Sequence, residues 1–288
     1  MDADMKRIWA ITNAAAGTAS EAAEAHVLSF CNRDPWQLQG CTRFPQEALP
    51  AAADLDTAEV DIVVVFGGDG THAAAARHLA GWPGALLLLP GGTVNLAPKR
   101  LHGDAHFIDV LDRAASQPLS ATPLPFIDVG GIPAYSGLIA GPIAGWVHAR
   151  ERVRAGRWRS LVRAVRFAWS LSFTRRISLS LGVMPRKRAR GIVASPPRDP
   201  DGEIEIAAID FRGFWSAMSV GIDWLKHGFD GARGISRTSA RSARLAGPAR
   251  MRVLIDGEEH HLPTPVGIET RTAAVRFVTT RTNDEGRE

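Results

Sequence analysis

Hydrophobic and polar residues along the first 120 positions follow two repeating patterns, one typical of buried strands and one typical of helices. Asp61–Phe66 is an almost continuous apolar run, as in strands that are buried on both faces of a parallel sheet. The predicted strands are Lys6–Thr12, Asp61–Phe66 and Ala85–Leu89, and the predicted helices are Thr18–Asn32, Thr71–Ala80 and Ala105–Ser116. Strands that alternate with helices predict a doubly wound parallel sheet, which is an α/β fold.

The pattern changes after the proline-containing stretch Pro118–Pro125. Beyond it, short segments alternate apolar and polar residues, as strands do when only one face is buried. These segments are Arg176–Leu181, Glu203–Ile206, Met251–Ile255 and Ala274–Val278. They predict an antiparallel sandwich or barrel, and of these two we expect the sandwich. The fold class is therefore predicted as α/β plus all-β, with an α/β nucleotide-binding domain over residues 1–122 and a β-sandwich domain over residues 123–288.

Two glycine-rich loops follow two of the predicted parallel strands. "GGDGT" (Gly67–Thr71) comes after the strand that ends at Phe66, and "PGGTVN" (Pro90–Asn95) comes after the strand that ends at Leu89. Ligands of open α/β sheets bind beyond the carboxyl ends of the strands, and helix N-termini favour phosphate. Two such loops favour a nucleotide site. The alternative is a pair of ordinary strand-to-helix turns in which Asp69 caps a helix.

Charge is unevenly distributed along the chain, although the net charge is only +4. Thirteen Arg or Lys residues and one acid lie between Arg150 and Arg190, so the remainder of the chain is acidic. On a helix over Arg157–Phe173, tryptophan and aliphatic residues would follow one face and arginines the other. This pattern suits an anionic membrane surface. A solvated helix packed on the sandwich is the alternative, and nucleic acid is not expected because no recognition motif accompanies the charge.

Other classes of protein lack support in the sequence. Cys31 and Cys41 are the two cysteines and form no C-x-x-C pair, so neither a disulfide framework nor a zinc site is predicted. No run of 18 apolar residues and no basic-then-apolar leader is present. The prediction is a cytoplasmic protein that makes peripheral contact with the inner membrane face. His102 and His106 are expected at the surface, and His260–His261 on an exposed strand.

Four motifs together resemble the catalytic domain of diacylglycerol kinases and their bacterial lipid-kinase relatives, including sphingosine kinases. They are "NAAAG" (Asn13–Gly17), "GGDGT", "PGGTVNL" (Pro90–Leu96) and "DGE" (Asp256–Glu258). The resemblance implies an ATP site between the domains and a lipid pocket in the second domain, and it leaves open a return of the last strand to the first domain. The residues that it implies for nucleotide binding are Asn13, Gly67, Gly68, Asp69, Gly70, Thr71, Gly91, Gly92, Thr93 and Asn95.

Three positions depart from the pattern of that family. Ala14 replaces a proline, Ala74 replaces a glutamate, and Leu96 replaces an aspartate that helps to bind magnesium in relatives. Magnesium prefers carboxylate and water oxygens, so fewer ligands remain here. A catalytically weak nucleotide-binding regulatory protein is therefore kept as an alternative.

Phosphoryl transfer to a hydroxyl needs a held γ-phosphate, a cation and a base near the attacking oxygen. Asp256 is the predicted base and Glu258 a predicted magnesium partner, which the resemblance also implies. Asp69 is a further predicted magnesium partner. The alternative for Asp256-Gly257 is a hairpin turn. The sequence thus predicts an ATP- and Mg²⁺-dependent lipid kinase that acts on a hydroxyl such as that of diacylglycerol. A basic membrane- or nucleic-acid-binding module is the further alternative, and the sequence leaves the oligomeric state open.

Overall fold

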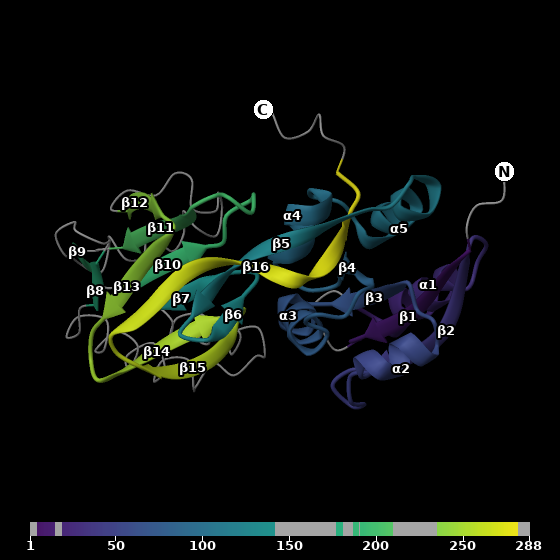
Figure 1. The fold of residues 1–288 in the computed structure, drawn as a ribbon, viewed down its shortest axis with the longest axis horizontal. Coiled ribbons are helices and arrows are strands. Elements are labelled where there is room, and N and C mark those ends of the chain that lie inside the picture. Colours follow the sequence, from purple (N-terminus) through teal and green to yellow (C-terminus); the bar gives the residue numbers. More distant parts are fainter. Residues whose placement is uncertain are drawn as a thin grey trace, which may run out of the picture. The chain divides into compact units, whose positions relative to one another are not determined.

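The computed structural model describes residues 5–14, 19–141, 177–180, 187–189, 191–209 and 235–281. The chain divides into two compact units, shown in Figure 1. Unit 1 comprises Met1–Pro125, Arg198–Pro200 and Thr272–Glu288, and unit 2 comprises Phe126–Pro197 and Asp201–Arg271. Strands β5 (Ser120–Val129) and β16 (Val266–Thr279) each begin in one unit and end in the other.

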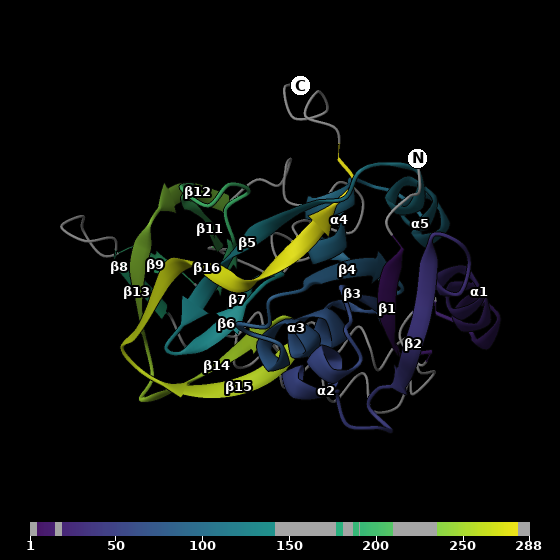
Figure 2. The ribbon, with the colours of Figure 1, turned by 45° about the vertical axis from the view of Figure 1, so that its right-hand side comes forward.

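Unit 1 contains a parallel sheet with the strand order β2, β1, β3, β4 and then the end of β16 (Figure 2). Its other strands are β1 (Lys6–Thr12), β2 (Trp36–Arg43), β3 (Ile62–Gly67) and β4 (Ala85–Pro90). The chain leaves β1 outward to β2 and then returns to β3 on the other side of β1. The direction of winding therefore reverses between β1 and β3, and a crevice for ligands forms at such a reversal.

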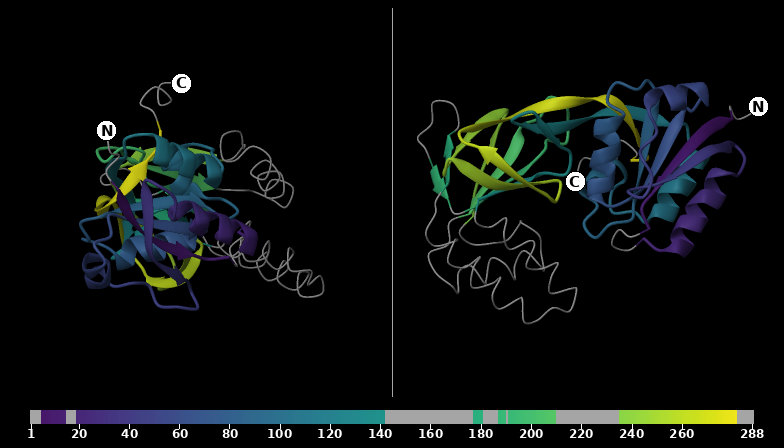
Figure 3. Two further views of the ribbon diagram at one scale, coloured as in Figure 1. Left: turned by 90° about the vertical axis from the view of Figure 1, so that its right-hand side faces the viewer. Right: turned by 90° about the horizontal axis from the view of Figure 1, so that it is seen from below.

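Helices pack on both faces of this sheet (Figure 3). The helices are α1 (Glu21–Cys31), α2 (Ala52–Thr57), α3 (Asp69–His78), α4 (Leu96–His102) and α5 (Phe107–Ser116). Residues of α1 and α5 share a core cluster with Ile62, Val64 and Phe66 of β3. Val63 and Val65 alternate with them and are also fully buried, which explains the unbroken apolar run. The predicted α/β organisation is confirmed.

Three elements of unit 1 are not predicted by the periodicity. Strand β2, "WQLQGCTR", lies at the edge of the sheet among the described strands and exposes polar residues that interrupt an apolar run. Helices α2 and α4 are short, and α4 contains Pro98.

Two predicted helices begin at other residues than expected. Helix α1 begins at Glu21, where the Ser20 side chain accepts a hydrogen bond from the Ala23 N–H. Helix α3 begins at Asp69, two residues before the predicted start.

Unit 2 is built from antiparallel strands in two sheets. One sheet has the order β12, β11, β10, β7, β14, β15, and the other joins β16 to β13, β8 and β9, with β5 paired to β16 and β6. Its strands besides β5 and β16 are β6 (Ile132–Ala134), β7 (Leu138–Ala140), β8 (Ile177–Ser180), β9 (Lys187–Ala189), β10 (Gly191–Ser195), β11 (Ile204–Ile209), β12 (Ile235–Ala240), β13 (Ser242–Ala246), β14 (Arg250–Ile255) and β15 (Glu258–Pro263). Leu245 and Ile268 of one sheet share an apolar core with Ile192 and Val253 of the other. The predicted all-β part of the fold is therefore present.

The basic segment predicted as a helix over Arg157–Phe173 lies outside the described residues. Within the described ranges, no helix combines the length and the hydropathy needed to cross a membrane.

His102 is buried, which corrects the prediction of a surface position. Its side chain is only 1% exposed, and its Nδ1 lies 3.0 Å from the Thr280 hydroxyl near the end of β16. Burial, with smaller contributions from His72 and Arg113, lowers the pKa of His102 from 6.5 to about 3. The sequence pattern missed this because it did not predict α4, whose last turn directs His102 inward.

His106 is exposed, as expected, and its ring accepts a hydrogen bond from Ile108 N–H at the start of α5.

The neutral state of His102 predicts that acid weakens the fold. The pKa is lowered in the folded state, so the unfolded chain binds the additional proton, and stability is lost as pH falls from 6.5 towards 3. We expect the free energy of unfolding to fall by about 2 kcal/mol between pH 7 and pH 5 through His102 alone. Urea denaturation at both pH values should show this contribution disappear in His102→Gln. His78→Gln, a substitution of an exposed histidine on α3, should keep it.

Candidate functional site

The site begins at the carboxyl ends of β1 and β3, where the direction of winding reverses. Asn13 follows β1, and its backbone N–H donates to the Phe66 carbonyl at 2.9 Å. Its side-chain amide donates to the Thr71 hydroxyl at 3.0 Å. Asn13 therefore connects the end of β1 to the first turn of α3, and it brings together two of the predicted nucleotide-binding residues.

The two glycine loops pack directly against each other. Gly91 N–H donates to the Gly67 carbonyl at 2.9 Å. A Cβ atom on Gly92 would lie 2.7 Å from Gly68 Cα, and one on Gly91 would lie 3.1 Å from Gly67 N. A separation of 2.7 Å is shorter than real Cβ contacts with backbone atoms, so the neighbouring loop excludes a side chain at Gly92. A side chain at Gly91 would be tightly packed against Gly67.

Helix α3 directs its N-terminus toward this part of unit 1. Gly68 is its N-cap residue and makes no side-chain cap hydrogen bond, and Asp69, Gly70 and Thr71 form its first turn. The first N–H groups of a helix have no partner within the helix, and the dipole adds partial positive charge there. This arrangement can accept phosphate oxygens. The alternative function of Asp69 as a cap also has support, because its Oδ1 lies 3.4 Å from the Ala97 N–H at the start of α4.

Asn95 closes the second loop. It adopts the left-handed conformation with φ 55°, and its Oδ1 accepts a hydrogen bond from Gly92 N–H at 2.7 Å. Its Nδ2 donates to the Gly92 carbonyl at 2.9 Å. Asparagine tolerates this backbone conformation better than most residues. The loop is therefore held by its own asparagine, while Thr93 beside it is exposed.

His72, the residue after "GGDGT", connects helix α3 to the end of strand β4. It is buried, and its Nε2–H donates to the Leu89 carbonyl at 3.1 Å, at the end of β4. Burial lowers the pKa of His72, so the ring is neutral at pH 7. Sequence analysis did not identify this role. The only signal was a polar residue on the face of α3 that carries Ala75 and Ala76, both buried.

Arg43 is a second residue that the sequence analysis missed. It ends β2, which reaches the same edge of the parallel sheet as the glycine loops. Its Nε donates at 2.9 Å to Glu24, and the Thr12 hydroxyl donates to the same carboxylate oxygen at 2.9 Å. Glu24 is buried, whereas the Arg43 side chain is 65% exposed. Arg43 is thus anchored by an ion pair at the same edge of the sheet as the glycine loops.

Carboxylates are scarce around the loops. Among the described residues, no three His, Cys, Asp or Glu side chains form a group that could hold a metal ion. Asp69 is the acid of the glycine loops, and Leu96, the residue in place of an aspartate, is 42% exposed. Mg²⁺ is often held by one or two carboxylates together with phosphates and water. Asp69 fits a magnesium ion that a nucleotide brings with it, but not a metal centre built by side chains alone.

Asp256 lies in the turn between β14 and β15. It has φ 51° and Gly257 has φ 87°, the left-handed pair that a tight hairpin requires, so the hairpin interpretation is correct for the backbone. The side chain has a second role, since it is only 6% exposed and accepts N–H groups from the segment before β7. These are Tyr135 at 3.0 Å, Ser136 at 2.6 Å and Gly137 at 3.1 Å.

Glu258 begins β15 directly after this turn. Its side chain is about half exposed, and Oε2 lies 3.9 Å from His260 Nε2. Asp256 and Glu258 belong to unit 2, whereas the glycine loops belong to unit 1. The predicted catalytic residues are thus adjacent to each other on one hairpin. His260 is half-buried and His261 exposed on the same strand.

Comparison with known families finds a match for the first part of the chain. Residues 7–124 match the family model described as the diacylglycerol kinase catalytic domain. The resemblance seen in the sequence motifs is confirmed for this segment. The match covers all of the glycine-loop residues and Asn13, and it ends before Asp256 and Glu258. No curated protein matches the chain in sequence.

Solved structures extend the similarity of fold over the whole chain. A diacylglycerol kinase from Bacillus anthracis str. Sterne is 16% identical, with a TM-score of 0.63, and the alignment covers 96% of this chain and 98% of that one. Another structure from the same organism, described as a candidate diacylglycerol kinase, is 17% identical with a TM-score of 0.62 at the same coverage. At this level of identity the comparison shows a shared fold, and it does not transfer substrate or activity.

The close packing of the two glycine loops can be tested at Gly92. We expect Gly92→Ala to lower the free energy of unfolding by about 1–3 kcal/mol, because the added methyl group overlaps Gly68. The matched control is Gly267→Ala, since a Cβ there meets no atom within 4 Å. Urea denaturation of both variants measures the difference. Equal stability of the two would contradict the loop contact.

Proposed function

We propose that this protein is an ATP- and magnesium-dependent lipid kinase that transfers the γ-phosphate to a lipid hydroxyl, such as that of diacylglycerol. The observation that carries the proposal is the pair of glycine loops at the reversal of winding, within a segment that matches the diacylglycerol kinase catalytic domain. A family of kinases implies ATP as phosphate donor and usually a divalent metal. We assign nucleotide binding to residues 1–122 and lipid binding to residues 123–288.

The nucleotide phosphates are proposed to lie at the N-terminus of α3. N–H groups of Asp69, Gly70 and Thr71 would donate to phosphate oxygens, with Asn13 holding Thr71 in place. Gly68 and Gly70 are the loop glycines at this helix start, and a residue without a Cβ atom allows a ligand to approach the backbone. Magnesium, when bound, neutralises charge on the transferring phosphate. Asp69 and Glu258 are the carboxylates that we assign to hold it.

Asp256 is the proposed base for the acceptor hydroxyl. Its three N–H donors hold the carboxylate in one orientation. Each carboxylate oxygen can accept more than one hydrogen bond, so a held carboxylate can still accept a proton. These contacts also give Asp256 a structural role that the sequence did not reveal. Replacement of Asp256 therefore disturbs the Tyr135–Gly137 segment as well as the proposed proton transfer.

A nucleotide-binding protein with little turnover is the second candidate. The observation in its favour is Leu96, an exposed leucine in the first turn of α4. The next residue, Ala97, directs its backbone N–H toward Asp69 Oδ1. A leucine there cannot bind a cation, so a single carboxylate is left at the loops. Such a protein would bind ATP but transfer phosphate slowly.

Contact with an anionic membrane remains a proposal that rests on the basic segment. That segment lies outside the described residues, so its support is the run of arginines in the sequence alone. A lipid acceptor dissolved in a bilayer requires the enzyme to reach the membrane surface. Lys and Arg near an anionic surface contribute about 1 kcal/mol each.

The proposed activity predicts transfer of radiolabelled phosphate from γ-labelled ATP to a lipid. We expect labelled product with at least one member of a panel of lipids that carry free hydroxyl groups, diacylglycerol among them. ATP binding without any labelled lipid would instead support the second candidate.

Gly70→Val tests the assigned phosphate site. The variant should not bind ATP in calorimetry, although circular dichroism shows a folded protein, because its branched side chain blocks the approach of the phosphate to the backbone. Unchanged ATP affinity in folded Gly70→Val would exclude the assigned phosphate site.

Asp256→Asn tests the proposed base. We expect single-turnover transfer to fall by about 10²–10⁴-fold with little change in ATP affinity, because the variant lacks the carboxylate that accepts the proton. An amide also directs its own N–H groups at backbone donors, so we expect a loss of about 1–3 kcal/mol in the free energy of unfolding. Rates are therefore measured at a temperature at which denaturation curves show the variant fully folded.

The matched control is Glu259→Gln on the same hairpin. It removes one negative charge next to the turn and breaks the contact with Arg252, without altering the Asp256 carboxylate. We expect transfer within a few-fold of the unsubstituted protein. A folded Asp256→Asn variant that transfers phosphate at the unsubstituted rate would falsify the role as base and leave a structural role alone.

A further inference from the structure

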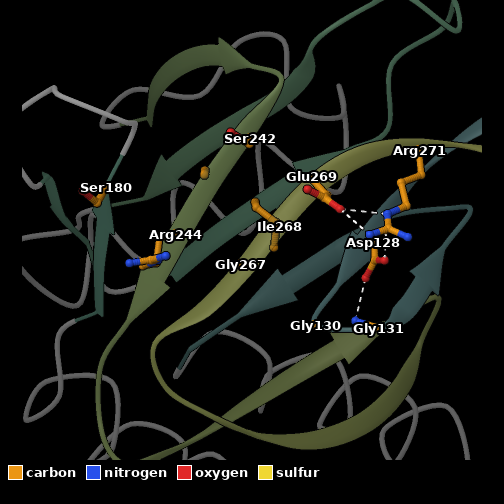
Figure 4. A pocket seen from close by; sticks show the side chains of 11 residues that line it. Asp128, Gly130, Gly131, Ser180, Ser242, Arg244, Gly267, Ile268, Glu269 and Arg271 are labelled. Carbon is orange, nitrogen blue, oxygen red and sulfur yellow. Dashed lines mark hydrogen bonds and ion pairs between the residues drawn. The ribbon is translucent and has the colours of Figure 1, made fainter.

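Unit 2 contains a cavity of about 790 Å³ on the outer face of one of its sheets (Figure 4). It lies over strands β8, β13 and β16 and is bordered by the turn between β5 and β6. The side chains and backbone that line it are Asp128, Gly130, Gly131, Ser180, Ser242, Ala243, Arg244, Gly267, Ile268, Glu269 and Arg271. Its volume is within the range of small-molecule sites, and none of its lining residues belongs to the proposed kinase site.

Strand alternation explains why this face is polar. Ala243 and Leu245 of β13 point into the core, so Ser242 and Arg244 point outward. On β16, Ile268 is buried in the core, while Glu269 lies outside. Ser242 pairs with Glu269 across the two strands, and Arg244 pairs with Gly267. Polar side chains from adjacent strands thus share one concave surface.

Charges within the cavity are separated into two ends. At one end, Arg271 lies between two carboxylates, with its Nε 3.1 Å from Asp128 Oδ2 and its Nη2 2.6 Å from Glu269 Oε1. Two acids face one guanidinium there, which leaves an excess of one negative charge. At the other end is Arg244, whose side chain makes no ion pair or hydrogen bond with any part of the chain that the structure describes.

The Arg244 end also offers hydroxyl groups and open space. Ser180 of β8 is its cross-strand partner on one side, and Gly267 is its partner on the other. Figure 4 shows Arg244 between these two strands. Gly267 contributes no side chain, and a Cβ there would meet no atom within 4 Å. The surface next to the guanidinium is therefore unfilled.

We propose that this cavity binds a phosphate ester that also carries a hydroxyl or ammonium group. The Arg244 guanidinium and the hydroxyls of Ser180 and Ser242 would donate to phosphate oxygens, a set of donors suited to that group. Glu269 and Asp128 would accept the hydroxyl or ammonium donor at the other end. A phospholipid headgroup and a small phosphorylated metabolite share this chemistry. The cavity lies within residues 123–288, to which lipid binding is assigned above, but the proposal uses no residue of the glycine loops or of the Asp256 hairpin.

Calorimetry with glycerol 3-phosphate and the full-length protein tests the site. We expect binding that Arg244→Gln weakens by about tenfold to a hundredfold, because charge-assisted hydrogen bonds to the phosphate are lost. The matched control is Arg250→Gln, which removes the same charge from an exposed arginine on β14 that does not line the cavity. It should leave the affinity unchanged.

Gly267→Leu provides a second variant that keeps every charge. Its side chain has room beside the backbone and would occupy the space next to Arg244, so we expect it also to abolish binding in a protein of unchanged stability. Co-sedimentation with phosphatidylglycerol vesicles, against phosphatidylcholine vesicles, identifies the source of the ligand. Loss of vesicle binding in Gly267→Leu indicates a lipid headgroup, and retained vesicle binding with loss of glycerol 3-phosphate indicates a soluble ligand.

Two results would overturn the proposal. One is the absence of glycerol 3-phosphate binding at dissociation constants below about 10 mM. The other is binding that Arg244→Gln and Gly267→Leu both leave unchanged, which would place the phosphate elsewhere in the protein.

Discussion

The contact between the two glycine loops determines the geometry of the candidate site in unit 1. Gly67 and Gly91 are joined by a backbone hydrogen bond, and Gly92 lies against Gly68 so closely that a methyl group does not fit. Strands β3 and β4 are adjacent and parallel, so their ends reach the same edge of the sheet. The loops can therefore support each other, and the start of α3 is held at this edge of the sheet.

Support for these loops comes from one buried and two half-buried polar residues. Asn13 holds Thr71, Asn95 closes the second loop on itself, and His72 donates to the end of β4. Each of these hydrogen bonds satisfies a polar group that would otherwise be costly to bury. The result is a site whose backbone is positioned before any ligand arrives. Such pre-organisation is what phosphate binding by main-chain N–H groups requires.

Unit 2 uses one turn for two purposes. The Asp256-Gly257 pair satisfies the backbone demands of a hairpin, and the Asp256 carboxylate holds the Tyr135–Gly137 segment through three N–H groups. A structural role and a proposed catalytic role thus fall on one side chain. The two interpretations were alternatives in the sequence because a D-G pair alone carries no information about distant partners. They become compatible once the partners are known.

The sequence by itself determined the order and type of the strongly periodic elements, the two glycine loops and the family resemblance of residues 7–124. These features depend on local spacing, which a chain displays without folding. Tertiary structure alone decided the place of strand β2 at the sheet edge, the burial of His102 and the exclusion of a side chain at Gly92. Each of these depends on atoms that are distant in sequence: β2 extends the sheet at β1, His102 meets Thr280, and Gly92 meets Gly68. Periodicity records which residues face a core, but not which segment supplies the opposite surface.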